Sequence, residues 1–344
     1  MSLIKVTDHQ LREWCVNKFL HVGVNDYDAR IAADVLVHAN LRGVDSHGVL
    51  RMEHYIRKLE HNGINPNPKM AVTRTGVATA MVDGDDGLGH VVAEKAMSIA
   101  IELAQESGVG VVSAINSSHC GALSYFVEMA ANKEMIGIAM TNTDKMVVPF
   151  GGSAAYFGTN PIAFGFPAGN QAPILLDMAT SSVAYGKILE SIHLGKEIPL
   201  DWAVDAAGQP TADPHQASAL LPFGGPKGYG VGLVVDLFAG ILTGSPFGPY
   251  IKKMYGGDPG EQRKLGHFVC AIDISRFTNK ESFATNLIRM MDDLHEMPPA
   301  PGFNRVMLPG EPEELRKQER LMQGIPISEE LYHYLKSQDV QSRL

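Results

Sequence analysis

A change of pattern after residue 62 limits what this chain can fold into more than any other feature. Before this point apolar residues recur at helical spacing, as at Leu11, Cys15 and Phe19. After it, short β-branched runs alternate with Gly, Pro and Asn, which is typical of strands joined by turns. The sequence therefore predicts an α/β protein with a helical N-terminal part followed by a sheet.

Three helices are expected before the change of pattern. Thr7 can cap the first and Asn25 the second, because their side-chain oxygens accept hydrogen bonds from free N–H groups at a helix start. The third is expected from about Ser46 to His61.

The rest of the chain is predicted to be mixed. Strand-like runs occupy residues 72–82, 108–115, 136–141, 162–166, 174–176 and 267–274, and helices are expected at 91–106, 123–132 and 230–242. From about residue 279 the pattern is helical again. We therefore expect a mixed central sheet domain (residues 71–278) and a helical domain built from both termini (residues 1–70 and 279–344).

Composition and charge exclude several classes of function. The 344 residues are 45% hydrophobic and 19% charged, which indicates a globular protein. A formal net charge of −9, without a run of Lys or Arg, argues against nucleic-acid binding and against an anionic membrane surface. The three cysteines fit no disulfide framework, no signal-peptide pattern is visible, and no apolar run is long enough to span a bilayer. A cytoplasmic protein is expected.

The run from residue 42 to 51 concentrates groups that bind a small anion. If Ser46 begins a helix, His47, Arg51 and Tyr55 lie along one face of it. A guanidinium pairs with a carboxylate through two parallel hydrogen bonds, and an imidazole transfers protons near neutral pH. A solvated helix face is the alternative.

A second cluster surrounds His119, in the sequence Ser117-Ser118-His119-Cys120. It lies between a buried strand and an amphipathic helix, a junction at which a scaffold often fixes catalytic groups. Asp144, after another strand, could polarise His119 if the fold brings them together. The alternative is a histidine that only satisfies helix amides. Cys120 is not favoured as a nucleophile, because adjacent residues rarely point at each other.

Nucleotide and metal motifs are incomplete. Gly87-Leu88-Gly89-His90 lacks the third glycine and the acidic residue of a dinucleotide fingerprint. The segment 224–230 (GGPKGYG) is no Walker motif, yet its glycines, Lys227 and the helix after it could hold a phosphate. A tight turn before a buried helix is the alternative. No HExxH or carboxylate–histidine cluster is present, so no catalytic metal is expected.

Seven segments occur in an order that resembles one known family: RGVDSHG, SSHCGALSYF, MVVPFGG, FGTNPIAF, LDMATSSVAYGK, GGPKGYG and APGFNRV. Over essentially the whole chain they resemble the malate/L-lactate/ureidoglycolate dehydrogenase family. The resemblance implies an α/β fold that binds a nicotinamide cofactor, NAD, without a Rossmann domain. It also implies a homodimer that acts on a small 2-hydroxy acid.

The resemblance further implies roles for individual residues. His119 becomes the acid/base, with His47 as the reserve candidate. The substrate-side groups are Ser46, His47, Arg51 and Tyr55. The cofactor contacts are Thr143, Asp177, Met178, Ala179, Lys227, Pro309, Gly310 and Glu311. Thr143 stands where serine is expected in close relatives, and it keeps the hydroxyl.

Within the family the chain is most similar to ureidoglycolate dehydrogenases, on residues 146–152, 198–205 and 300–313. This similarity implies NAD-dependent oxidation of (S)-ureidoglycolate to oxalurate. Malate or L-lactate is the alternative substrate, and a non-catalytic binding protein is the alternative of a different class. Amide partners for a ureido group are expected from Asn116, Asn142 or Asn160.

Overall fold

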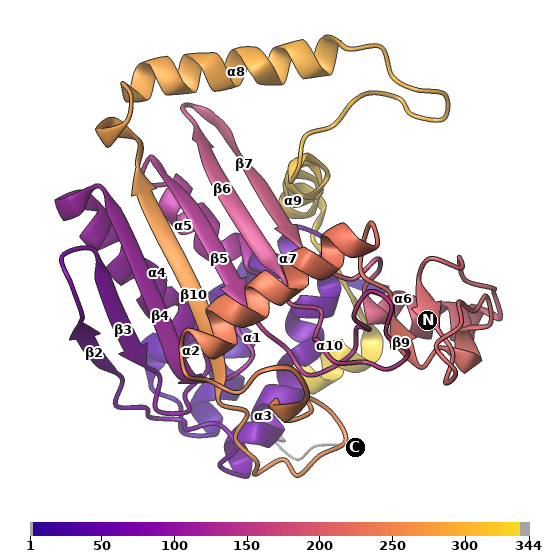
Figure 1. Ribbon diagram of the computed structural model, residues 1–344. Coiled ribbons are helices and arrows are strands. Elements are labelled where there is room, and N and C mark those ends of the chain that lie inside the picture. Colours follow the sequence, from indigo (N-terminus) through magenta and orange to yellow (C-terminus); the bar gives the residue numbers. More distant parts are fainter. Residues whose placement is uncertain (1–2, 338–344) are drawn as a thin grey trace.

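Seven strands form one central sheet in the order β2-β3-β4-β10-β5-β6-β7 (Figure 1). The computed structural model describes residues 3–337, so residues 1–2 and 338–344, the outer ends of the expected helical domain, lie outside it. The strands are β2 (Ala71–Arg74), β3 (Thr79–Asp83), β4 (Val109–Ser117), β5 (Met135–Thr141), β6 (Ile162–Ala168), β7 (Gln171–Met178) and β10 (Leu265–Asp273).

The sheet is mixed, as the sequence predicts. Only β3 and β4 run parallel, and every other neighbouring pair is antiparallel. A Rossmann sheet is mostly parallel with helices on both faces, so this topology is a different one. The prediction of one strand over residues 72–82 is wrong, because a turn splits it into the β2–β3 hairpin.

Helices cover both faces of the sheet (Figure 1). On one face, α4 (Gly89–Ser107) and α5 (Ser124–Ala131) bury Val92, Phe126 and their neighbours against β4, β5 and β10. On the other face, α7 (Pro226–Asp236) packs Val235 against Phe268 and Met140, and a π-helical turn, Leu237–Ile241, prolongs it. The central strands are therefore buried on both sides, so functional side chains are expected at the ends of the strands.

The N-terminal part begins with two capped helices, as predicted. Thr7 forms a capping box with Gln10 at the start of α1 (Asp8–His21), and the Asn25 side chain caps α2 (Asp26–Leu41). The third helix, α3 (Met52–Glu60), is shorter than expected.

Both ends of the described chain meet in a two-stranded sheet. β1 (Leu3–Val6) pairs with β11 (Ile325–Ser328), and α10 (Glu329–Lys336) packs beside α1. These short strands carry too little pattern to be predicted. α9 (Glu311–Gln323) leads into them, whereas α8 (Lys280–Glu296) stands against β6 through Met291. The division into two domains stays a prediction.

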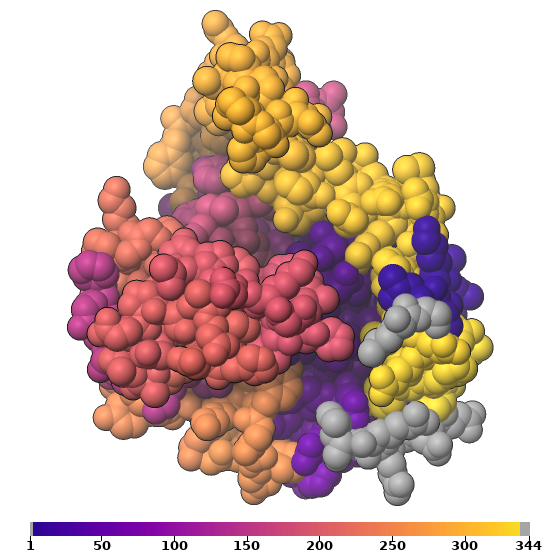
Figure 2. Space-filling view, turned by 90° about the vertical axis from the view of Figure 1, so that its right-hand side faces the viewer, coloured from indigo at the N-terminus to yellow at the C-terminus, as the bar shows by residue number. Residues whose placement is uncertain are grey.

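The chain segment that follows β7 and precedes α7 in the sequence forms a separate lobe. It contains α6 (Tyr185–Leu194) and the two-stranded sheet of β8 (Ala203–Val204) and β9 (Ala219–Leu220). Figure 2 shows this lobe and the C-terminal helices on either side of a hollow, with N-terminal residues at its floor. Further 3-10 helices are Pro214–Gln216, Gly248–Tyr250 and Ile274–Arg276. None of the helices within residues 3–337 is long and apolar enough to cross a membrane.

Candidate active site

Residues 45–51, called the substrate turn after the role expected for them, are not part of a regular helix. Two short 3-10 helices occupy it, and α3 begins only at Met52. Gly48 passes so close to Asn40 that an added Cβ would lie 2.1 Å from the amide oxygen. The prediction of a helix from Ser46 is therefore wrong, because the backbone turns at Gly48 to pack on Asn40.

Asp45 anchors the substrate turn to two other elements. Its carboxylate accepts two hydrogen bonds from the guanidinium of Arg320 on α9, at 2.6 and 2.9 Å, and one from the Asn40 amide on α2, at 2.6 Å. Arg320 is largely buried and also donates to the backbone carbonyl of Asn40. Paired, charge-assisted bonds of this kind fix geometry as well as adding stability.

His119 lies in the loop between β4 and α5, as the sequence predicts. The Ser118 hydroxyl holds this loop, because it accepts from Gly89 N at 2.8 Å and donates to the Gly87 carbonyl at 3.0 Å. A Cβ on Gly89 would lie 2.1 Å from the Ser118 carbonyl oxygen. The glycine segment that fails as a dinucleotide fingerprint thus supports the histidine loop.

Tyr55 and His47 meet His119 in space. The Tyr55 hydroxyl lies 2.6 Å from His119 Nδ1, and the Gly121 backbone N–H lies 3.3 Å from the same nitrogen. The ring of His47 stacks on that of His119 with centroids 5.7 Å apart, and Ser46 Oγ lies 3.0 Å from His47 Nδ1. Among residues 3–337 no hydrogen bond engages His119 Nε2, which leaves that nitrogen for a ligand.

Desolvation keeps both histidines neutral. Although each residue as a whole is only partly buried, burial lowers the pKa of His47 to about 4 and the pKa of His119 well below its usual value. The positive charge of Arg51 adds to both shifts. Burial raises the pKa of the fully buried Tyr55, so it remains a phenol. A neutral imidazole next to a neutral phenol is a suitable base.

A hydrogen bond from Nε fixes the Arg51 side chain and leaves its two terminal nitrogens able to bind a ligand. Its Nε donates to the Ser46 carbonyl at 2.6 Å, and the guanidinium carbon lies 5.2 Å from the centroid of the Tyr255 ring. The terminal nitrogens make no hydrogen bond within the described part of the chain. Such a fork can hold a carboxylate next to His119.

Asp144 does not contact His119. Its Oδ1 accepts from Arg263 Nη2 at 2.5 Å, and its Oδ2 accepts from the Met254 backbone at 3.3 Å. The expected Asp144–His119 contact is therefore absent, and Tyr55 occupies Nδ1 instead. Arg263 is not marked by any sequence motif, and its only signal is its position just before β10, the strand that contains His267.

The expected cofactor residues gather at one end of β5, β6 and β7. Asp177 and Met178 are the last residues of β7 and not part of the turn that the sequence predicts. The Thr143 hydroxyl accepts from Thr159 N at 2.9 Å, and Thr180, just after Ala179, donates from its backbone N–H to the Thr159 carbonyl at 2.8 Å. Phe223, before the glycine segment, donates to the Thr180 carbonyl at 3.1 Å. Gly310, between Pro309 and Glu311, lies against Leu175 of β7, where an added Cβ would be 2.5 Å from the carbonyl oxygen.

The start of α7 has the features of a phosphate site. Gly224 and Gly225 both have positive φ, at 54° and 62°, which side chains rarely adopt. Lys227 in the first turn is exposed, and none of the ion pairs found within residues 3–337 includes it. Free N–H groups and a cation at a helix start favour a phosphate or pyrophosphate.

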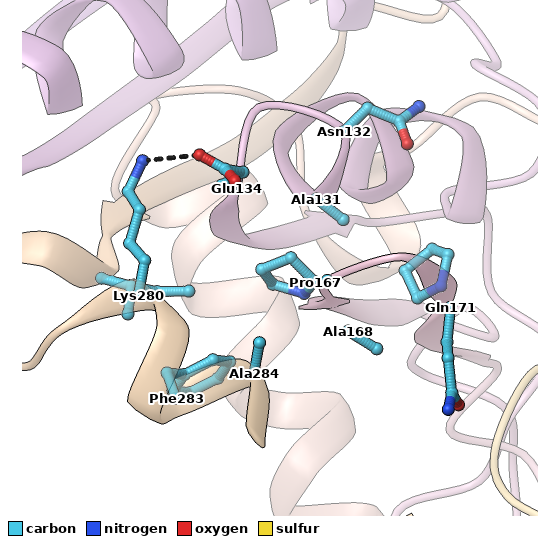
Figure 3. Close-up of a pocket in the computed structure, with 12 residues that line it drawn as sticks. Ala131, Asn132, Glu134, Pro167, Ala168, Gln171, Lys280, Phe283 and Ala284 are labelled. Atoms are coloured by element: carbon cyan, nitrogen blue, oxygen red, sulfur yellow. Dashed lines mark hydrogen bonds and ion pairs between the residues drawn. The ribbon is translucent and has the colours of Figure 1, made fainter. Parts of the chain in front are cut away.

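Another pocket lies far from His119, between the α5 end, the β6–β7 hairpin and α8 (Figure 3). Its main charged feature is the ion pair between Lys280 and Glu134, at 3.1 Å. Cys120 is buried and its pKa is raised to about 12, chiefly by burial, so it is no thiolate nucleophile. No cluster of three metal-binding side chains occurs in the described residues.

The stacked histidines, the Tyr55 phenol and the partly free guanidinium of Arg51 form a set that suits proton transfer on a small anion. The chain belongs to the malate/L-lactate dehydrogenase family, whose model matches residues 6–336. It is thus an oxidoreductase of that family with a small hydroxy acid as substrate.

The curated relatives differ in substrate. The chain is 40% identical to the ureidoglycolate dehydrogenase (NAD(+)) of Escherichia coli K12, over 97% of this chain and 95% of that protein. It is 43% identical to the L-sulfolactate dehydrogenase of Methanocaldococcus jannaschii, over 91% and 90%. A solved structure of the sulfolactate dehydrogenase from that organism superimposes with a TM-score of 0.91 at 41% identity, covering 97% of this chain and 96% of that one. The malate dehydrogenase of Pyrococcus horikoshii is 40% identical, over 95% and 92%.

Proposed function

We propose that this protein oxidises (S)-ureidoglycolate to oxalurate with NAD as the hydride acceptor. The observation that carries the proposal is the free Nε2 of His119, held between Tyr55 and His47 and next to the guanidinium of Arg51. This set can bind the carboxylate of a 2-hydroxy acid and remove its hydroxyl proton.

In the proposed reaction Arg51 holds the substrate carboxylate and His119 is the base. For Nε2 to accept the hydroxyl proton, Nδ1 must carry the ring proton and donate it to Tyr55 Oη. Ser46 and His47 orient the substrate oxygen, with His47 as the reserve base. General-base help of this kind contributes about 10²- to 10⁴-fold in rate.

The cofactor is assigned to the end of β5–β7. The start of α7 with Lys227 would hold the pyrophosphate, and the remaining contacts would come from Thr143, the end of β7 at Asp177-Met178-Ala179 and the turn Pro309-Gly310-Glu311. A bound nicotinamide would supply the acceptor for the hydride that leaves the substrate α-carbon. NAD is preferred to NADP because the ureidoglycolate relative is named for NAD(+).

The first test is absorbance of the reduced nicotinamide during turnover. NAD and NADP are each offered with ureidoglycolate, malate, sulfolactate, L-lactate and glycolate. Rapid NADH formation with ureidoglycolate supports the proposal. Preference for malate, sulfolactate or lactate would contradict the ureide assignment and leave the His119 chemistry in place.

Malate or L-lactate oxidation is the second candidate. It is favoured by the similar identity of the chain to relatives named for malate and sulfolactate. All these substrates share the carboxylate and the hydroxyl, so Arg51 and His119 serve them equally. Specificity among these substrates must therefore depend on the group at the end opposite the carboxylate.

We also propose that the protein is a homodimer. Leu237, Ile241 and Leu242, in and just after the π-helical turn that follows α7, expose 46%, 50% and 60% of their surface, which is unusual for neighbouring apolar side chains on a monomer. Light scattering after size exclusion would show twice the chain mass if this is right and the chain mass if it is wrong.

A further inference from the structure

The end of the substrate opposite the carboxylate needs a hydrogen-bond donor, and the side-chain amide nitrogens of the expected asparagines are already engaged, whereas the buried Asn142 Oδ1, which has no partner within residues 3–337, can only accept. Asn116 donates its amide to Asp83, at 2.9 Å, and Asn160 donates to the Gly232 carbonyl, at 3.0 Å. The Asn142 amide donates to Asp236, at 3.1 Å, and to a backbone carbonyl. All three amide nitrogens hold the fold together.

Arg263 lies at the same end of the sheet as His119. β10 runs between β4 and β5, with Leu265 paired to Ser117 and His267 paired to Thr141. Leu265 and Ser117 face each other in the antiparallel β4–β10 pair. Arg263 precedes Leu265 by two residues and His119 follows Ser117 by two residues, so both leave the sheet at the same end. The topology thus places the guanidinium beside the histidine loop, and its charge contributes to the low pKa of His119.

Arg263 is fixed and has a donor to spare. It is 4% exposed, its Nε donates to the Lys252 carbonyl at 3.0 Å, and its Nη2 donates to Asp144. The remaining nitrogen, Nη1, is buried and has no partner within residues 3–337. A buried guanidinium donor left unsatisfied is costly, and native proteins rarely keep one without a use.

We propose that Arg263 Nη1 donates a hydrogen bond to the oxygen at the distal end of the substrate and so determines specificity. This inference rests on the proposed function of the site. Since Asp144 balances the charge of Arg263, the pair presents a donor with little net charge. A neutral ureido carbonyl suits such a donor better than a second anion, the carboxylate of malate or the sulfonate of sulfolactate.

The first experiment compares substrates that differ at the distal end in Arg263→Met. We expect kcat/KM for ureidoglycolate to fall about 100-fold, because a site that hydrogen-bonds its substrate loses most when the bond is removed. L-lactate, which has no distal polar group, should change less than about threefold. Arg74→Met, which removes an exposed guanidinium on β2 that pairs with Glu106, is the matched control.

The second experiment tests the charge balance with Asp144→Asn, which keeps an acceptor for Arg263 and removes the negative charge. We expect the ratio of kcat/KM for ureidoglycolate to that for malate to fall at least about tenfold, since Arg263 then acts as a net cation. An unchanged ratio would overturn the role of Asp144.

Binding measurements without turnover distinguish two cases: Arg263 does not contact the distal group, or the enzyme does not oxidise ureidoglycolate. In calorimetry with NADH present, oxalurate carries the distal ureido group and oxamate does not. Arg263→Met should weaken the binding of oxalurate and leave the affinity for oxamate unchanged, even if the wild type turned over no substrate in the panel. Equal losses for both ligands, or equal losses for lactate and ureidoglycolate, would reduce Arg263 to a structural residue. Arg263→Lys, which keeps the charge, covers the case in which Arg263→Met does not fold.

Discussion

At the scale of single residues, the site depends on which nitrogen of His119 carries the proton. Tyr55 Oη and the Gly121 N–H both approach Nδ1, at 2.6 and 3.3 Å. The Gly121 N–H can only donate, which favours a bare Nδ1, whereas Tyr55 can also accept and so allows Nδ1–H. Only the second tautomer leaves Nε2 free to act as a base.

Tyr55→Phe should therefore lower kcat by about 10²- to 10⁴-fold while leaving cofactor affinity nearly unchanged. Without the phenol, Gly121 remains the one hydrogen-bonding neighbour of Nδ1 in the described chain, and the proton moves to Nε2. Steady-state kinetics and NADH fluorescence titration measure the two quantities. A kcat within a few-fold of the wild type would show that Tyr55 does not select the tautomer.

The pH dependence of oxidation tests the low pKa of His119. The base form is neutral, so activity is present above the pKa of His119 and is lost as pH falls through it. Because burial, together with the charge of Arg51, lowers this pKa, the acid limb of kcat/KM should lie below 6.5, the usual value for histidine.

Arg51→Gln supplies the comparison for that pH profile. It removes a positive charge that lowers the pKa of His119, so the acid limb should move to higher pH as KM for the substrate rises. An acid limb at the same pH in both proteins would mean that another group titrates.

At the scale of elements, α9 joins the two halves of the site. Its first turn follows Gly310 in the assigned cofactor turn, and Arg320 in its last turn holds Asp45 of the substrate turn. One helix thus connects the loop assigned to the cofactor with the residues proposed to orient the substrate.

Arg320→Lys should raise KM for the hydroxy acid about tenfold with a smaller change in kcat, since lysine cannot form the two parallel bonds to Asp45. The substrate turn would then lose its fixed position while His119 keeps its own. Asp45→Asn should give a similar change, and the double variant should be no worse than the more impaired single one. Additive losses in this cycle would show that the two residues act separately.

The sequence predicts the elements that carry their own pattern. The capped α1 and α2, the strand before His119 and the helix after it follow from periodicity and caps that lie within a few residues. The shape of the substrate turn does not, because Asp45 depends on Arg320, 275 residues away. Arg263 was missed for the same reason: its burial and its bond to Asp144 exist only once β10 lies between β4 and β5.

At the scale of the whole molecule, several buried or half-buried histidines are held neutral. Burial lowers the pKa of His54 and His90 to about 3 and the pKa of His267 to about 4. An unfolded chain would protonate them near pH 6.5, so they make the folded state lose stability as pH falls below that value. Buried carboxyl groups with raised pKa, such as Asp28 and Asp236, act in the opposite sense.

His90 offers a test of this balance. It is fully buried beside Tyr55, with ring centroids 4.7 Å apart, and both ring nitrogens lack a partner among the described residues. In His90→Leu the proton uptake of this group on unfolding is gone, so the free energy of unfolding should fall less between pH 7.5 and pH 5 than in the wild type. The difference is expected to be about 2 kcal/mol, from about 1.4 kcal/mol per pH unit below 6.5. Urea denaturation at both pH values measures it, with exposed His9→Leu as the control. If the free energy of unfolding falls equally in His90→Leu and in the wild type between these pH values, His90 takes up no proton on unfolding. Its burial beside Tyr55 would then not destabilise the folded state at low pH.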